Sequence, residues 1–351
     1  MTRLALVGVS KTFGSTVALR DVDLAVAAGE LVAVLGPSGS GKTTLLRAIA
    51  GLDVLDAGTV SFDGRDLTQS DTRARNVGMV FQDFALFPHL SVRENIAFGL
   101  RARHAGARDE RVFAAAAQAR IETLLDRKPA TLSGGEKQRV AVARALACAP
   151  VAYLFDEPFA SLDTPLRATL RVEFAELRAQ LDAAMLFVTH DQSEALALGD
   201  RIAVMRGGTI EQIGTADELL AAPATRFVAE FVGLPPRSVI DGAIERGTFV
   251  AHGCQLVRVE AADGPASLAI PPEAFDVRAG GRLAGTVRLI ETIGSGKYAS
   301  ILVGNDTLVV ALDDRVLRAG EGVAIDVRAS FTRGWLFDAA GRRIAEASRA
   351  A

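Results

Sequence analysis

The pattern of hydrophobic and polar positions differs between two segments of the chain. Up to about residue 232, short apolar runs typical of buried parallel strands alternate with longer stretches typical of helices. The apolar runs lie at residues 31–35, 59–62, 77–81, 151–155, 185–188 and 202–205. Strands that alternate with helices predict a largely parallel sheet that is covered on both faces.

The stretches between these runs predict helices. Residues 91–128 are rich in Ala, Arg and Leu, and residues 44–50, 133–147 and 193–198 have a similar character. A further helix opens at Thr164-Pro165, because proline is tolerated in the first turn. Its apolar stripe consists of Leu166, Leu170, Phe174, Leu177 and Leu181. Residues 1–30 instead alternate apolar and polar positions, which favours short antiparallel strands.

The second segment begins near Gly233-Leu-Pro-Pro236. Beyond it, short apolar runs are separated by turn clusters such as 262–264, 279–281 and 304–306. This spacing is typical of an all-β barrel or sandwich. We therefore predict a first domain at residues 1–235 and a β-barrel domain at residues 236–351.

Composition excludes several function classes. The net charge of -3 argues against a mainly nucleic-acid-binding protein, and residues 237–351 carry equal numbers of basic and acidic side chains. The two cysteines are far apart, and the four histidines (His89, His104, His190 and His252) are not spaced as metal ligands. No apolar stretch reaches the roughly 18–20 residues that span a bilayer, and the N-terminal apolar run is too short for a signal peptide. At a membrane, the chain would be a peripheral subunit.

Residues 36–43 read Gly-Pro-Ser-Gly-Ser-Gly-Lys-Thr, between a predicted strand and a predicted helix. The alternative is a glycine-rich turn without chemistry, but strand, loop and helix together favour a phosphate-binding loop. Its glycines let backbone N–H groups converge on an anion at a helix N-terminus. The predicted nucleotide contacts are Gly36, Pro37, Ser38, Gly39, Ser40, Gly41, Lys42, Thr43 and Thr44.

Two further motifs carry candidate chemistry. Asp156 and Glu157 end an apolar strand, where open α/β sheets bind ligands, although a solvated acidic turn is the alternative. Ser133-Gly134-Gly135-Glu136 opens a helix with the pattern of a capping box. That motif is either a well-capped helix and nothing more, or a second phosphate cradle at a positive helix end.

These motifs, in this order, resemble the ATP-hydrolysing subunit of ATP-binding-cassette (ABC) transporters over about residues 1–232. Gln82 matches the Q-loop glutamine, Asp163 the D-loop, and His190 the switch histidine of that family. Phe13 matches an aromatic that stacks on adenine, although a lone Phe is more often a core residue. A lone His190 would likewise more often be a packed or exposed histidine.

The resemblance implies a P-loop NTPase fold with a parallel core sheet, an antiparallel β subdomain, a helical subdomain at about 84–150 and a C-terminal OB-like barrel. It implies ATP and Mg²⁺ as cofactors, with Thr43, Gln82 and Asp156 at the metal. Glu157 would act as general base and His190 would steady the γ-phosphate, while Lys42 would neutralise developing charge. Two ATP would lie in a homodimer, between the loop of one copy and Ser133, Gly134, Gly135, Glu136 and Asp163 of the other.

The resemblance also implies partners. The C-terminal segment resembles the regulatory barrel of importer ATPases, although Pro271 replaces an arginine that often occurs there. We therefore expect two integral-membrane permease subunits, a periplasmic or extracellular solute-binding protein, no nucleic acid, and a peripheral location on the cytoplasmic face of the inner membrane. Ferric iron or a polyamine is the favoured solute, with oxyanions, thiamine and sugars as alternatives.

Three alternatives remain open at this stage. Phe84, Leu86, Phe87 and Pro88 form either packing beneath the helical region or a groove for helices of the membrane subunits. For the function of the whole chain, a nucleic-acid or translation-linked ATPase is an alternative to the transporter subunit. A regulatory sensor that has lost hydrolysis is a third, which the presence of Lys42 and Glu157 opposes.

Overall fold

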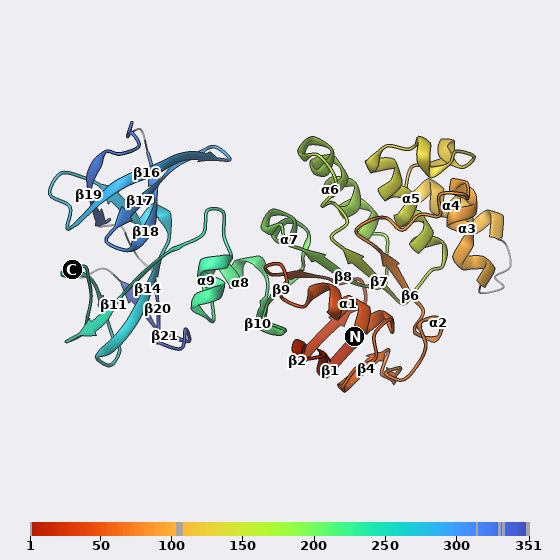
Figure 1. The fold of residues 1–351 in the computed structure, drawn as a ribbon, viewed down its shortest axis with the longest axis horizontal. Coiled ribbons are helices and arrows are strands. Elements are labelled where there is room, and N and C mark those ends of the chain that lie inside the picture. Colours follow the sequence, from red (N-terminus) through yellow and green to blue (C-terminus); the bar gives the residue numbers. More distant parts are fainter. Residues whose placement is uncertain (1, 103–107, 314, 329–330, 332–333, 349–351) are drawn as a thin grey trace. The chain divides into compact units, whose positions relative to one another are not determined.

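The computed structural model describes residues 2–102, 108–313, 315–328, 331 and 334–348, and His104 lies outside them. Contacts between residues divide the chain into two compact units, Met1–Ala216 and Asp217–Ala351 (Figure 1). Two short helices, α8 (Ala216–Ala221) and α9 (Arg226–Phe231), precede the strands of the second unit. The domain boundary predicted between residues 235 and 236 lies after these helices and stays a prediction.

The core of the first unit is a six-stranded sheet with the order β10-β9-β3-β8-β7-β6. Within this order, β9, β3, β8, β7 and β6 pair in parallel, whereas β10 runs antiparallel to β9. The prediction of a largely parallel sheet is confirmed. The strands are β3 (Leu31–Leu35), β6 (Val77–Val80), β7 (Ala152–Asp156), β8 (Ala184–Thr189), β9 (Arg201–Arg206) and β10 (Thr209–Gly214).

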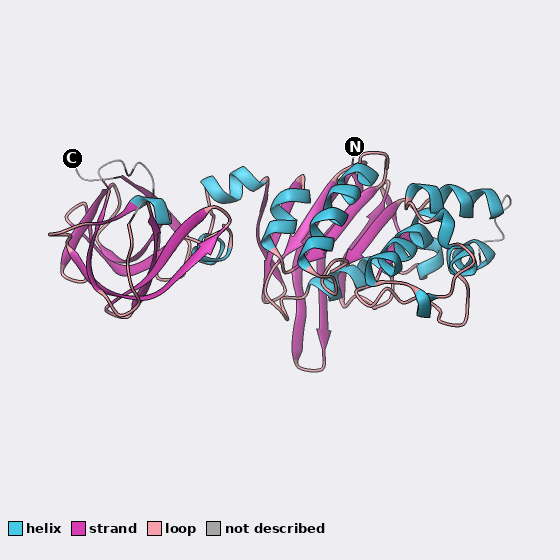
Figure 2. Cartoon of the chain, turned by 90° about the horizontal axis from the view of Figure 1, so that it is seen from above, coloured by secondary structure: helices cyan, strands magenta, loops and turns pink. Residues whose placement is uncertain are grey.

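Helices cover both faces of this sheet because successive side chains of a strand point to opposite faces. On β7, Leu154 belongs to a buried cluster that includes helix α1 (Lys42–Ala50). Its neighbour Phe155 lies on the other face, with its ring centroid 4.9 Å from that of Phe174 on α6 (Thr164–Arg178). The strands and their flanking helices are distinguished by colour in Figure 2.

An antiparallel sheet with the order β2-β1-β4-β5 shares the α1 cluster. Its strands are β1 (Thr2–Phe13), β2 (Thr16–Ala27), β4 (Ala57–Phe62) and β5 (Arg65–Asp66). The antiparallel strands predicted at residues 1–30 are thus one long hairpin of β1 and β2.

The helical region contains three helices that pack on one another: α3 (Val92–Ala102), α4 (Arg108–Gln118) and α5 (Gly134–Ala147). Short elements complete the unit: α2 (Thr72–Arg75), η1 (Glu122–Leu124), η2 (Pro129–Thr131) and α7 (Gln192–Leu198). Among the described residues, no helix has the length and apolar composition that crossing a membrane requires.

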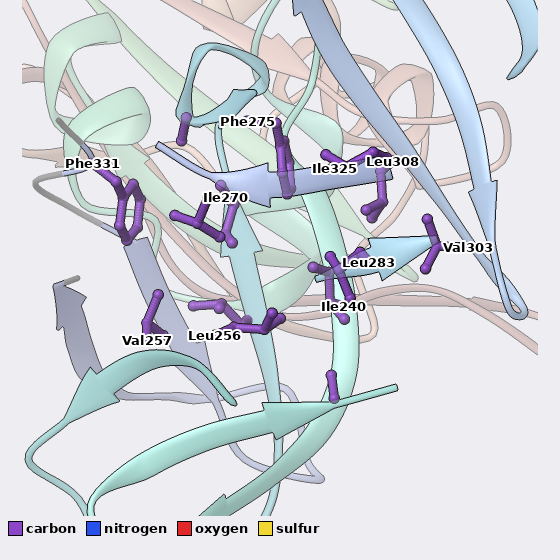
Figure 3. Close-up of a cluster of buried hydrophobic side chains, with 14 of the residues drawn as sticks. Ile240, Leu256, Val257, Ile270, Phe275, Leu283, Val303, Leu308, Ile325 and Phe331 are labelled. Carbon is purple, nitrogen blue, oxygen red and sulfur yellow. The ribbon is translucent and has the colours of Figure 1, made fainter. Parts of the chain in front are cut away.

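The second unit contains a closed barrel with the strand order β11-β12-β13-β21-β20-β14. A five-stranded sheet, β15-β19-β16-β17-β18, packs with it around one apolar core, in which Ile240, Leu256, Phe275 and Leu308 point toward one another (Figure 3). The barrel strands are β11 (Ser238–Glu245), β12 (Thr248–Ala251), β13 (Cys254–Val259), β14 (Gly264–Ile270), β20 (Gly334–Phe337) and β21 (Arg343–Ser348). The sheet strands are β15 (Phe275–Val277), β16 (Leu283–Ile293), β17 (Gly296–Val303), β18 (Asp306–Leu312) and β19 (Gly322–Val327), and η3 (Pro272–Ala274) precedes them. The all-β C-terminal region is confirmed.

Candidate functional site

The glycine loop between β3 and α1 has a shape that only glycine permits. A Cβ on Gly36 would lie 2.4 Å from the carbonyl oxygen of Met205, and one on Gly41 would lie 2.4 Å from that of Ala18. Gly41 also has a φ of 102°, a left-handed conformation that other residues rarely adopt. Gly39, with a φ of 76°, faces open space instead. The loop is thus a concave strip of backbone next to the N-terminus of α1.

Lys42 lies inside this loop. It is 5% exposed, and its Nζ atom donates to the carbonyl oxygens of Gly36 at 2.8 Å and Pro37 at 2.9 Å. Burial lowers the pKa of Lys42, and the negative charges of Glu157 and Asp156 oppose that shift. An additional anion at the loop would favour the charged ammonium further, which suits a phosphate-binding lysine.

Asp156 ends strand β7 beside this lysine. Its Oδ1 accepts a hydrogen bond from the Thr43 hydroxyl at 3.1 Å. Burial raises the pKa of Asp156 and the neighbouring Glu157 charge raises it further, whereas the Thr43 hydrogen bond and the charges of Lys42 and Arg47 lower it. A carboxylate and a hydroxyl side by side are hard oxygen ligands of the kind that Mg²⁺ prefers. A bound cation would offset the cost of burying this carboxylate.

Glu157 and His190 face each other across the ends of neighbouring strands. Oε2 of Glu157 lies 2.9 Å from Nδ1 of His190, whose side chain is 60% exposed. Glu157 has a left-handed φ of 45°, and its N–H donates to the carbonyl oxygen of Val188 at 3.0 Å. A non-glycine residue in this conformation costs about 1–3 kcal/mol and is typical of functional sites.

One cavity of about 630 Å³ is lined by more than half of the predicted site residues. Its walls contain, from the prediction, Ser38, Gly39, Ser40, Gly41, Lys42, Thr43, Thr44, Gln82, Glu157 and His190. Three residues that the sequence motifs missed also line it, namely Thr16, Val17 and Ala18 on β2. These belong to an ordinary amphipathic strand, so no motif marks them.

The cavity fits a nucleoside triphosphate. Its size lies in the range of about 300–1,000 Å³ that is common for ligand pockets. The hydroxyl oxygen of Ser40 is buried without a protein hydrogen-bond partner among the described residues. Gly39 leaves open space above the loop, where a phosphate group has room. Phe13 does not line the cavity; it is 49% exposed, with Lys11 Nζ 5.2 Å from its ring centroid.

The Ser133 motif lies elsewhere in the unit. Ser133 Oγ accepts from the Glu136 N–H at 3.3 Å, and Glu136 Oε2 accepts from the Ser133 N–H at 2.7 Å, so the predicted capping box forms. That second bond lowers the pKa of Glu136. Gly134 packs against Leu162, just before α6, and Gly135 packs against Leu166, in the first turn of α6, which Asp163 caps. None of these five predicted nucleotide contacts lines the cavity of its own chain.

Two polar residues that sequence reasoning missed, the half-buried Arg144 and the fully buried Asn95, hold the segment after Gln82. Arg144 on α5 donates to the carbonyl oxygens of Phe84 and Ala85. The fully buried Asn95 accepts from the Phe87 N–H at 2.8 Å and donates to carbonyl oxygens of the same loop. Their partners are backbone atoms, which leave no residue pattern in the sequence.

Comparison with known proteins decides the family. A family model described as "ABC transporter" matches residues 19–160. The sn-glycerol-3-phosphate import ATP-binding protein UgpC of Rhizobium meliloti (strain 1021) is 40% identical, and the alignment covers 98% of this chain and all of that protein. The chain belongs to the ABC transporter ATPase family. UgpC of Ruegeria pomeroyi is 39% identical over 99% of this chain and 100% of its own length.

Solved structures agree with this assignment. The dimeric structure of MJ0796, a bacterial ABC transporter cassette, has a TM-score of 0.55 and 34% identity, covering 60% of this chain and 98% of that one. A post-hydrolysis state of MJ0796 bound to ADP and Pi matches equally well. The predicted fold class and ATPase activity are confirmed: this ABC protein binds and hydrolyses ATP as the ATP-binding subunit of an importer. ABC cassettes dimerise, as MJ0796 does.

Proposed function

We propose that this ABC ATPase drives uptake of sn-glycerol 3-phosphate or a closely similar sugar-type phosphate. The observation that carries the proposal is the relationship to UgpC over both units, including the barrel. These relatives are named for that solute, so they do not support ferric iron or a polyamine, the solutes first expected from the sequence.

The proposed catalytic roles follow from the cavity. Lys42 and the loop N–H groups bind the phosphates, and Thr43, Gln82 and Asp156 hold Mg²⁺. When bound, Mg²⁺ supplies positive charge against the phosphate oxygens. Glu157 orients the attacking water and accepts its proton, and its contact with His190 fixes the carboxylate. His190 is exposed enough to reach a γ-phosphate oxygen.

The active state that we propose is a homodimer with two ATP molecules. Ser133, Gly134, Gly135, Glu136 and Asp163 do not reach the cavity of their own chain, so a second copy would supply them. The ATPase dimerisation of MJ0796 supports this arrangement. Adenine stacking on Phe13 belongs to the same proposal, because the ring is exposed rather than part of the core.

The proposed membrane partners are two permease subunits, with a solute-binding protein acting through them. The loop after Gln82 supports this, because the ring centroid of its half-buried Phe87 lies 4.3 Å from that of Phe98 on α3, and Phe98 remains 45% exposed. An exposed aromatic ring beside a loop that buried polar contacts hold favours a docking surface over simple internal packing. The chain would then lie peripherally on the cytoplasmic face of the inner membrane.

Reconstitution tests the solute and the partners together. The full chain is co-expressed with candidate permease subunits, placed in liposomes, and given a solute-binding protein with sn-glycerol 3-phosphate, ferric ion, spermidine or maltose. We expect ATP hydrolysis and uptake to rise with sn-glycerol 3-phosphate alone. Stimulation by ferric ion or spermidine instead would overturn the solute assignment, and failure to copurify with any permease would overturn the importer partners.

A further inference from the structure

A charged network on the far side of the Glu157–His190 pair has no role in the mechanism described so far. At its centre is Arg167 on α6, whose Nη2 donates to the carbonyl oxygen of Leu162 at 3.0 Å. Its Nη1 donates to Asp191 Oδ2 at 3.2 Å. Leu162 directly precedes Asp163, and Asp191 directly follows His190. One guanidinium therefore ties together the two loops that carry those residues.

The loop around His190 is held by further hydrogen bonds. Thr189 Oγ1 donates to Glu194 Oε2 at 2.6 Å and accepts from the Asp191 N–H at 3.0 Å. Asp191 Oδ1 in turn accepts from two N–H groups at the start of α7, at Ser193 and Glu194. The backbone on both sides of His190 is thus fixed, and the Arg167–Asp191 bond joins the loop directly to α6.

The third nitrogen atom of the Arg167 guanidinium, Nε, gives the decisive observation. This atom is buried and has no hydrogen-bond partner among the described residues. Glu194 Oε1 lies 3.8 Å from it, which is close enough for an ion pair but too long for a direct hydrogen bond. The Nε–H therefore needs another acceptor, and a water molecule can supply one where space allows.

A hollow of the right size lies at this place. Its volume is about 10 Å³, close to what one water molecule needs. It is lined mainly by polar residues, namely Glu157, Arg167, Thr189, His190, Asp191 and Glu194. A buried water requires two to four polar partners, and this lining offers the unpartnered Arg167 N–H and several carboxylate oxygens.

We propose that Arg167 is a positioning residue for ATP hydrolysis, which holds one ordered water behind the Glu157–His190 pair and keeps the loops of Asp163 and His190 in register. The inference rests on the proposed catalytic roles of Glu157 and His190. Arg167 acts through the loop of His190, to which Asp191 ties it, and Nδ1 of His190 lies 2.9 Å from Glu157 Oε2. Small misplacement of a catalytic group costs up to about 100-fold in rate.

Kinetics of the full chain test this role. Arg167→Met keeps a long, unbranched side chain and removes every donor. We expect its kcat for ATP to fall about tenfold with KM within about twofold of wild type, and Arg167→Lys to restore part of the rate. The matched control is Arg171→Met, one turn later on α6. Arg171 donates to the Ser193 hydroxyl at 3.0 Å and, among the described residues, makes no hydrogen bond to the loops of Asp163 and His190. Its kcat should stay within about twofold of wild type.

Three results would overturn the proposal: wild-type kcat in Arg167→Met, an equal loss in Arg171→Met, or a loss carried entirely by KM. A crystal structure of the wild-type full chain gives an independent test should Arg167→Met fold poorly. It should show a water within about 3.2 Å of Arg167 Nε, and a dry hollow would contradict the inference. Failure of the catalytic assignment is seen separately, as normal turnover in Glu157→Gln.

Discussion

The Arg144 guanidinium on α5 donates a hydrogen bond to the carbonyl oxygen of Phe84 at 2.9 Å, which joins the helix of the Ser133 motif to the loop after Gln82. Phe84 and Ala85 have φ values of 63° and 45°, so this loop is held in a left-handed conformation that non-glycine residues rarely adopt. Arg144 stabilises that conformation from a helix nearly 60 residues away along the chain.

We predict that Arg144→Met loosens the loop without unfolding the unit. Amide hydrogen exchange in residues 82–90 should speed up about tenfold or more, because bonds to a charged group are worth about 1.5–3 kcal/mol each. Mass spectrometry of the exchanged peptides gives the measurement. Arg139→Met is the control on the same helix, because Arg139 pairs with Glu173 rather than with this loop. Unchanged exchange at 82–90 in Arg144→Met would contradict the predicted support.

Glu157→Gln should abolish turnover while nucleotide binding survives. The amide keeps the shape of the side chain and its contact with His190, but it cannot accept the proton of the attacking water. Loss of a general base costs about 10²- to 10⁴-fold in rate. Phosphate release and ATP binding by calorimetry measure the two effects separately, and the variant should accumulate as an ATP-bound dimer. Turnover near the wild-type rate would remove Glu157 from the catalytic role.

The sequence was sufficient to predict the phosphate loop, the acidic strand end and the largely parallel sheet, because each depends on local pattern. Leu31–Leu35 is predicted and observed with the same bounds, because all five apolar side chains are buried in the central sheet and the run ends where the glycine loop begins. Arg144 and Arg167 could not be predicted. Both bind backbone carbonyl oxygens of loops whose positions depend on the folded sheet. The separation of Ser133 from the cavity of its own chain is likewise a property of the fold.

Gly41→Ala should destabilise the first unit far more than an alanine at an ordinary turn glycine. Its Cβ would lie 2.4 Å from a backbone oxygen, and its φ is 102°. We expect a loss of at least about 2 kcal/mol, together with weaker ATP binding. Gly64→Ala is the control, because Gly64 has a φ of 75° and faces open space, and it should cost only about 1 kcal/mol. Equal losses in urea unfolding would show that the crowded loop is not the cause.

Glu194 gives a prediction about pH. Burial raises its pKa, the Thr189 hydrogen bond opposes the shift, the Asp191 charge adds to it, and the Arg167 and Arg171 charges oppose it. A raised folded-state pKa means that the folded protein binds the proton more tightly than the unfolded chain. The stability from this protonation is complete below the unfolded pKa of about 4.3 and is lost as pH rises through the folded value.

Glu194→Gln should therefore gain stability relative to wild type as pH rises above the unfolded pKa of about 4.3. Urea midpoints by circular dichroism at several pH values measure the difference. Glu176→Gln makes the same change of charge on an exposed part of α6, and its midpoint should follow wild type. A Glu194→Gln curve parallel to wild type would contradict the assigned cause of the shift.

The two predicted roles of Ser133, as a helix cap and as a phosphate ligand, can be tested separately. The capping box uses Ser133 Oγ as an acceptor, so its hydroxyl proton remains available to a phosphate oxygen from another copy. Ser133→Ala should cost about 1 kcal/mol of stability through the lost cap. Thr225→Ala removes a cap bond of the same 3.3 Å length on α9 and should cost about the same.

The two variants should differ in ATP-driven dimerisation. A hydrogen bond to a charged phosphate is worth about 1.5–3 kcal/mol. The substitution removes one such bond at each of the two ATP sites, about 3–6 kcal/mol per dimer, which corresponds to about 10²- to 10⁴-fold in the dimer dissociation constant. We expect that loss in Ser133→Ala and none in Thr225→Ala, measured by sedimentation in the Glu157→Gln background with ATP. If both variants dimerise equally well, Ser133 acts only as a helix cap, and the proposed second phosphate contact is wrong.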